Sequence, residues 1–133
     1  MKILTTAFIA LFVSATLFSC KKDKDATPAN VAVEGKWEGT YINSASGNSF
    51  FFSFNFKSGG VMEEIDSNGE KIGEGTWTFE NNILMAKYHW LPPYSSSYSV
   101  IAAYYKNTGK LLGDWGYGNS NNDGGTWQMT KKN

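Results

Sequence analysis

The sequence predicts an all-β fold, an eight-stranded antiparallel up-and-down β-barrel. From residue 33 onward, apolar side chains recur at every second position in short runs, which is the period of a strand. Gly, Asn, Asp and Pro separate these runs, and no stretch has a convincing helical period. Because the connections are short, each strand most simply pairs with its predecessor, and eight such strands can close into a ring. A two-sheet sandwich is the main alternative, but it usually needs longer cross-connections.

The first four predicted strands take residues 35–42, 49–57, 61–66 and 71–79. The second strand has the clearest alternation, because four phenylalanines share one face: Phe50, Phe52, Phe54 and Phe56. Residues 58–60 and 67–70 are rich in Ser, Gly and Asn, which are typical of tight turns. We therefore expect aromatic rings to line the inside of the barrel.

The last four predicted strands take residues 83–90, about 96–106, 111–117 and 125–131. Pro92 and Pro93 separate the fifth strand from the sixth, because proline cannot donate a hydrogen bond to a strand ladder. Residues 80–82, 107–110 and 119–124 supply the remaining turns.

Four of the five tryptophans stand in the tripeptide Gly-x-Trp. Alternation places each glycine on the same face as its tryptophan, where the missing side chain leaves room for a neighbouring strand or a sharp bend. We expect all four of these rings to point inward: Trp37, Trp77, Trp115 and Trp127.

The segment from Gly35 to Tyr41 resembles the first strand of the lipocalin and lipocalin-like group, which opens with Gly-x-Trp. Residues 75–84 look like the middle hairpin of small lipocalin-like domains in bacterial lipoproteins. The resemblance covers about residues 33–131 and implies a ligand-binding barrel, without implying which ligand. Typical lipocalins also place an arginine across the first-strand tryptophan. This chain has no arginine, so Lys131 or Lys132 would take that role.

The first twenty residues have the pattern of a secretory signal that ends at the only cysteine, Cys20. The apolar stretch at residues 3–18 is shorter than a membrane span needs. Residues 17–20 resemble the lipobox of bacterial lipoproteins, whose cysteine is diacylated and becomes the first residue of the mature protein. The resemblance implies three parts: a signal peptide at 1–19, a lipidated flexible tether at 20–32 and a barrel domain at 33–133.

Composition and the residue after Cys20 indicate location and partners. Lipoproteins kept in the inner membrane often carry aspartate directly after the cysteine, whereas this chain has Lys21. The resemblance therefore favours the outer membrane of a bacterial cell envelope, on its periplasmic or its exposed side, with the lipid on Cys20 as the membrane contact. The net charge is zero and arginine is absent, so we expect no binding to nucleic acid. The sequence indicates no particular protein partner.

No constellation of catalytic or metal-binding residues stands out. His89 is the only histidine and Cys20 the only cysteine, so the usual zinc ligand sets are missing. The serines at residues 95–99 show no nucleophile signature. Glu63 and Glu64 alternate between the two faces of their strand and cannot act as a pair. We therefore expect no enzyme activity and no cofactor.

Glu63 is the one charged residue that we expect inside the barrel. If Val61 and Ile65 point inward, Glu63 does too, and a carboxylate among aromatic rings needs a partner or a raised pKa. The other register, with Met62 inward, removes this hypothesis. The predicted ligand contacts are Trp37, Phe52, Glu63, Trp77, Trp115 and Trp127.

These observations favour a lipid-anchored, non-catalytic binding module for a small, largely apolar ligand. The alternative is a structural or protein-interaction lipoprotein whose barrel is filled by its own side chains. Eight strands enclose an interior barely wide enough for side chains or one small ligand, so the sequence leaves both functions open.

Overall fold

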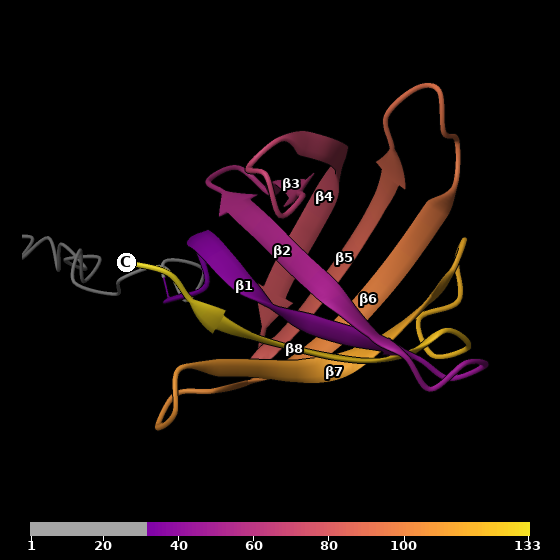
Figure 1. The fold of residues 1–133 in the computed structure, drawn as a ribbon. Coiled ribbons are helices and arrows are strands. Elements are labelled where there is room, and N and C mark those ends of the chain that lie inside the picture. Colours follow the sequence, from indigo (N-terminus) through magenta and orange to yellow (C-terminus); the bar gives the residue numbers. More distant parts are fainter. Residues whose placement is uncertain (1–31) are drawn as a thin grey trace, which may run out of the picture.

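The structure, a computed structural model, describes residues 32–133. In this part of the chain eight antiparallel strands pair in chain order, and β8 pairs with β1 to close a barrel (Figure 1). The strands are β1 (Gly35–Asn43), β2 (Ser49–Lys57), β3 (Val61–Ile65), β4 (Lys71–Glu80), β5 (Ile83–Trp90), β6 (Ser97–Tyr105), β7 (Lys110–Tyr117) and β8 (Gly125–Lys131). The predicted up-and-down barrel is confirmed. The predicted signal peptide and the lipidation site at Cys20 lie outside the described residues.

The strand boundaries follow the sequence pattern closely. Strands β2, β5 and β8 have the predicted bounds, β6 is one residue shorter at each end, and the others differ by one residue at one end. β3 is shorter than predicted, and its pairing with β4 shifts register between Glu64 and Ile65. Within residues 32–133, no helix is long and apolar enough to cross a membrane.

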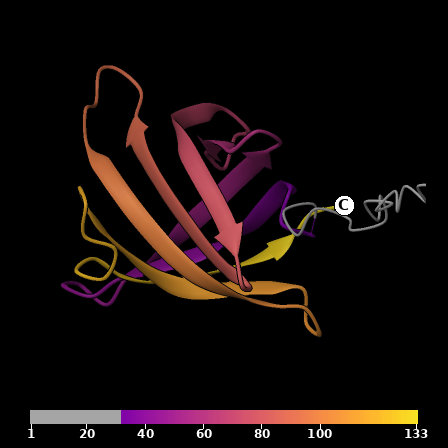
Figure 2. The ribbon, with the colours of Figure 1, turned by 180° about the vertical axis from the view of Figure 1, so that it is seen from behind.

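The two ends of the barrel differ. The turns β2–β3, β4–β5 and β6–β7 lie at the same end as residue 32 and the C-terminus, which we call the closed end (Figures 1 and 2). The loops that follow the odd-numbered strands surround the other end, which we call the mouth. At the closed end Val33 is fully buried, and its carbonyl accepts a hydrogen bond from the indole of Trp37 at 2.7 Å. Lys131 donates to the carbonyl of Ala32 at 3.2 Å and so ties this segment to β8.

The inward face of β2 supplies much of the core, as predicted. Phe54 is fully buried, and its ring centroid lies 4.4 Å from that of Phe52 and 5.6 Å from that of Phe56. Phe50 shares this face but lies at the rim, where it is 44% exposed and stacks on Tyr41. The phenylalanine row therefore runs from the solvent-facing rim into the dry core.

The four tryptophans of the Gly-x-Trp tripeptides are all buried, and each indole N–H donates to a main-chain carbonyl. The acceptors are Val33 for Trp37, Lys57 and Val61 for Trp77, Ile42 for Trp115 and Asp114 for Trp127. The inward direction predicted for these rings is confirmed. Their polar atoms are satisfied inside the barrel wall, which removes the cost of burying them.

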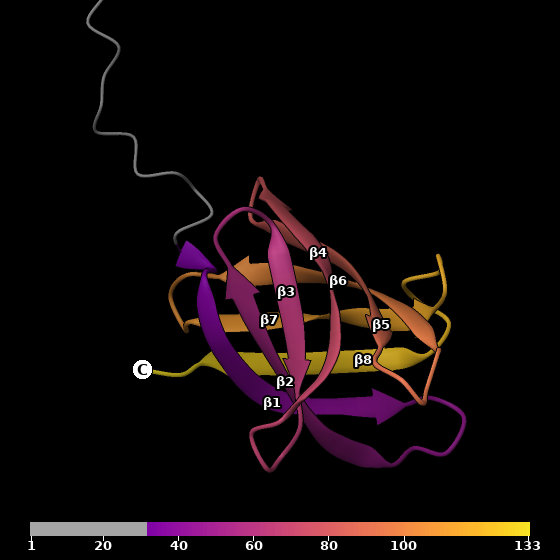
Figure 3. The same cartoon turned by 90° about the horizontal axis from the view of Figure 1, so that it is seen from above.

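Glycine allows neighbouring strands to approach closely at several inward positions. A β-carbon at Gly75 would collide with the carbonyl of Lys87, and one at Gly113 would collide with that of Ile101. Gly39 has the same role in the middle of β1, which curves strongly between β2 and β8 (Figure 3). These glycines permit the bending that a narrow barrel requires.

We expect Phe54→Ala to destabilise the protein by about 3–5 kcal/mol, because it leaves a cavity in the packed core. Phe51→Ala removes a ring from the outer face, where Phe51 is 40% exposed, and should cost far less. Urea unfolding of the two variants measures the difference. Equal losses would contradict the assignment of the two faces of β2.

Candidate functional site

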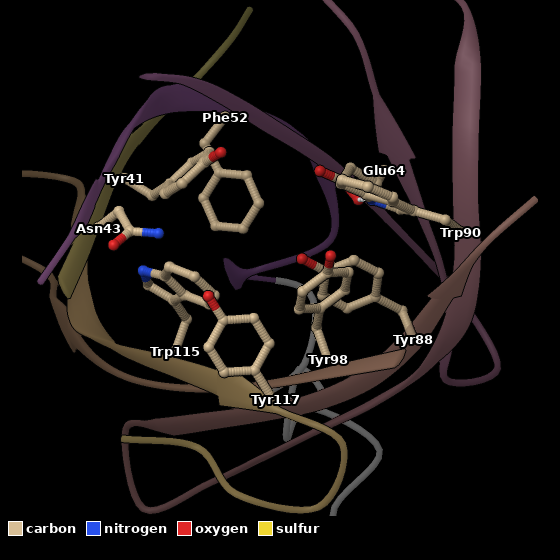
Figure 4. Close-up of a pocket in the computed structure, with 9 residues that line it drawn as sticks. All are labelled: Tyr41, Asn43, Phe52, Glu64, Tyr88, Trp90, Tyr98, Trp115 and Tyr117. Carbon is tan, nitrogen blue, oxygen red and sulfur yellow. Dashed lines mark hydrogen bonds between the residues drawn. The ribbon is translucent and has the colours of Figure 1, made fainter. Parts of the chain in front are cut away.

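The mouth opens into a cavity of about 150 Å³ (Figure 4). Nine residues from six strands line it, and seven of the nine are aromatic. They are Tyr41, Asn43, Phe52, Glu64, Tyr88, Trp90, Tyr98, Trp115 and Tyr117. The cavity therefore combines apolar walls with a single carboxylate.

The alternation of β3 places Glu64 inside the barrel. Met62 and Glu64 are both buried, with exposed fractions of 0% and 6%, so they share the inward face of this strand. Gly73 is paired with Glu64 on β4. A β-carbon at Gly73 would lie 3.2 Å from the Oε2 atom of Glu64, so the glycine leaves room for the carboxylate.

The carboxylate of Glu64 is held by Trp90. The indole Nε1 of Trp90 donates to Oε2 at 2.7 Å, and this is the only side-chain hydrogen bond that residues 32–133 give to the carboxylate. Burial raises the pKa of Glu64 to about 7, although the hydrogen bond from Trp90 lowers it in part. Glu64 therefore changes charge near neutral pH.

Four tyrosines line the cavity with this carboxylate, and the pKa values of three of them are raised. Burial raises the pKa of Tyr88 well above its ordinary value, and the charge of Glu64 raises it further. The pKa values of Tyr41 and Tyr98 are raised as well, mainly by burial, so all three phenols are neutral at physiological pH. Figure 4 shows the hydroxyls of Tyr88 and Tyr98 directed into the cavity. These hydroxyls can donate or accept hydrogen bonds with a ligand.

The inward direction expected for Glu63 is wrong. Glu63 lies on the outer face of β3, where its Oε1 atom is 2.6 Å from Nζ of Lys57 and 3.6 Å from Nζ of Lys71. The hydrogen bond from Lys57 is the main cause of its lowered pKa. The physical reason is the register of β3, because Met62 fills the interior and alternation then turns Glu63 outward.

The cavity brings together two of the six residues predicted to contact a ligand, Phe52 and Trp115. Trp37, Trp77 and Trp127 are buried in the barrel but do not line it. Sequence reasoning missed Glu64 and Trp90 as site residues, along with the tyrosines. The alternation of β5 puts Trp90 on the same face as Leu84, Ala86 and Tyr88, but Trp90 has no Gly-x-Trp motif to draw attention to it.

In the described part of the chain, other reactive or metal-binding side chains do not cluster near the cavity. His89 is exposed on the outer face of β5. Among residues 32–133, no three His, Cys, Asp or Glu side chains are grouped so as to hold a metal ion. The arrangement at the mouth consists of seven aromatic rings, one amide and one carboxylate around a concave space.

No protein-family model, no curated protein and no solved structure matches this chain. The class of protein is defined by the fold and its core: an eight-stranded closed β-barrel with a large cluster of aromatic side chains.

We expect Glu64 to make the protein less stable as the pH rises. The unfolded chain releases the proton of this carboxyl near its ordinary pKa of 4.5, whereas the folded protein keeps the proton up to about pH 7. The free energy of unfolding should therefore fall between pH 5 and pH 8, by on the order of 2 kcal/mol from this group. Urea unfolding at several pH values measures the fall.

Glu64→Gln should flatten this part of the pH profile and raise stability at pH 8, because the amide oxygen can still accept from Trp90. Glu63→Gln is the matched control on the outer face. Its lowered pKa gives stability that is lost only as the pH falls below the ordinary value of 4.5, so the fall from pH 5 to pH 8 should persist. A wild-type profile that Glu64→Gln leaves unchanged would contradict the raised pKa.

Proposed function

We propose that this protein is a non-catalytic, lipocalin-like binding protein for a small, largely apolar ligand, held in the bacterial cell envelope by a lipid on Cys20. The observation that carries the binding function is the cavity at the mouth. Binding sites for small molecules are typically concave and apolar, with a few polar groups that orient the ligand. The seven rings and the carboxylate of Glu64 have this composition.

The size of the cavity limits the ligand. A dry cavity of roughly 150 Å³ admits a benzene-sized group, and the cavity at the mouth has about this volume. The closed half of the barrel is filled by buried side chains such as Trp37, Leu84 and Met129. We therefore propose that one ring-sized part of the ligand enters between the aromatic walls while the rest extends into solvent.

A second candidate function is that of an interaction lipoprotein with an essentially filled barrel. Exposed aromatic side chains support this candidate. Phe50, Tyr94 and Tyr117 have exposed fractions of 44%, 66% and 52%, and aromatic residues are enriched in protein interfaces. A ligand-binding test separates the two functions.

The envelope location rests on the sequence. The apolar segment before Cys20 and the small Ser19 support lipidation, and Lys21 supports sorting to the outer membrane. We propose that the lipid is the membrane contact of the protein and that residues 20–32 act as a tether. The protein needs no cofactor and no nucleic acid for this function.

Binding should be visible in the five indole N–H resonances of ¹⁵N-labelled protein, assigned by single Trp→Phe variants. We expect the neutral probe benzyl alcohol to shift the resonances of Trp90 and Trp115 saturably, because both rings line the cavity. The resonances of Trp37, Trp77 and Trp127 serve as internal controls, since these rings lie outside the cavity lining. A library of single-ring probes that leaves Trp90 and Trp115 unshifted in the folded protein would support the filled barrel instead.

Lipidation is tested separately. We expect Cys20→Ala to abolish incorporation of labelled palmitate and to release the protein from the membrane fraction. Ser19→Ala keeps a small residue before the cysteine and should retain both properties. Membrane retention of an unlabelled Cys20→Ala protein would show that another feature anchors it.

A further inference from the structure

We propose that the ligand is an organic ammonium, a protonated amine carried by a ring or another small apolar group, and that Glu64 is its counter-charge. The inference rests on the proposed function, because it names the ligand class of the same cavity. The supporting observation is that the buried carboxylate of Glu64 lies among aromatic rings and can accept further hydrogen bonds.

The carboxylate is incompletely paired. Trp90 donates to Oε2, and the described residues give the carboxylate no other side-chain hydrogen bond. In residues 32–133, every fully buried side-chain oxygen has a hydrogen-bond partner. The Oε1 atom of Glu64 accepts no such bond, so this atom is not fully buried and keeps contact with the cavity space. Figure 4 shows one carboxylate oxygen beside the indole nitrogen of Trp90 and the other toward the space between the rings. A carboxylate in this position favours a ligand group that is positively charged and donates hydrogen bonds.

The walls suit the same charge. Faces of Tyr and Trp rings attract cations, and the attraction grows when water is displaced. Tyr88, Tyr98 and Trp90 surround the space in front of Glu64 in Figure 4. The rings of Tyr88 and Tyr98 lie 5.5 Å apart and those of Trp90 and Tyr98 lie 5.1 Å apart, so they form one continuous aromatic wall. An ammonium group here would meet a carboxylate, phenol oxygens and ring faces together.

Within residues 32–133, no cationic side chain lines this cavity. None of the nine residues that line the cavity is a lysine, an arginine or a histidine. Lys57 and Lys71 pair with Glu63 on the outer face. A metal ion fits the donor set poorly, because hard cations such as Ca²⁺ require several oxygen ligands, whereas this cavity offers one carboxylate.

Binding should depend on pH through Glu64 alone. The titratable groups that face it are Tyr41 on β1, Tyr88 on β5, Tyr98 on β6 and Tyr117 on β7. All four are phenols, and burial raises the pKa of Tyr41, Tyr88 and Tyr98 above the ordinary value of a phenol, so these three stay neutral between pH 6 and pH 8. The other cavity residues, from β1, β2, β5 and β7, carry no titratable side chain. An ammonium ligand must expel the proton from Glu64 when this group is neutral, so binding should weaken as the pH falls below about 7.

The test compares benzylammonium with benzyl alcohol, which have nearly the same shape but differ in charge. Titrations of the folded barrel are followed through the indole resonances of Trp90 and Trp115. At pH 8 we expect benzylammonium to bind at least tenfold more tightly than benzyl alcohol. Its affinity should fall about tenfold between pH 8 and pH 6, whereas that of benzyl alcohol should not fall.

Glu64→Gln should abolish both the preference for the charged probe and its pH dependence, while benzyl alcohol still binds. Glu63→Gln removes a carboxylate one residue away on the outer face and should leave both probes unchanged. Calorimetry in two buffers of different ionisation enthalpy should also show proton release when benzylammonium binds wild-type protein at pH 6.5. These wild-type measurements hold even if a variant folds poorly.

The outcomes separate the two proposals. If benzyl alcohol binds in the cavity but benzylammonium binds no more tightly, the ammonium assignment is overturned and the proposed binding function stands. If neither probe shifts Trp90 or Trp115 at any pH, the proposed binding function fails, and the ammonium assignment fails with it. A preference for benzylammonium that survives Glu64→Gln would assign the cation to another group and overturn the role of Glu64.

Discussion

The narrow interior of an eight-stranded barrel is the constraint on which the rest of this structure depends. An interior of this width holds little besides side chains. Each inward residue must therefore have a large side chain that fills space, or one small enough to admit a neighbouring strand. The Gly-x-Trp tripeptides meet both demands, because Gly75 and Gly113 admit the adjacent backbone and the following ring fills the space. The cavity at the mouth lies where the strands end and the packing of the core stops.

The hydrogen bonds of the tryptophans divide them into two groups. Four indoles donate to main-chain carbonyls and fix the barrel wall. Trp90 donates to the side chain of Glu64 instead, so its bond depends on a group that can change charge. Trp115 connects the two groups, because it donates to the main-chain carbonyl of Ile42 and, like Trp90, lines the cavity. The site is thus an extension of the core toward solvent.

The sequence predicted the fold almost completely, because alternation in strands such as β2 is strong and their faces differ clearly in polarity. The site was harder to predict. β3 has five residues, with apolar side chains at Val61, Met62 and Ile65 on both faces, so its own pattern does not decide which carboxylate points inward. Pairing with β2 and β4 settles the register and places Glu64 inside. No local signal in the sequence carries information about those long-range contacts.

The two ends of the barrel differ in what they carry, and this decides which end faces the surroundings of the protein. Residue 32 and the C-terminus lie at the end opposite the cavity (Figure 1). A support attached through either end of the described chain, whether a bilayer, a fused domain or a sensor chip, therefore sits behind the barrel and leaves the aromatic opening facing the bulk solution. Under the proposed binding function, a solute can then enter and leave without detachment of the protein, and a binding assay on an immobilised sample probes the same accessible face as one in free solution.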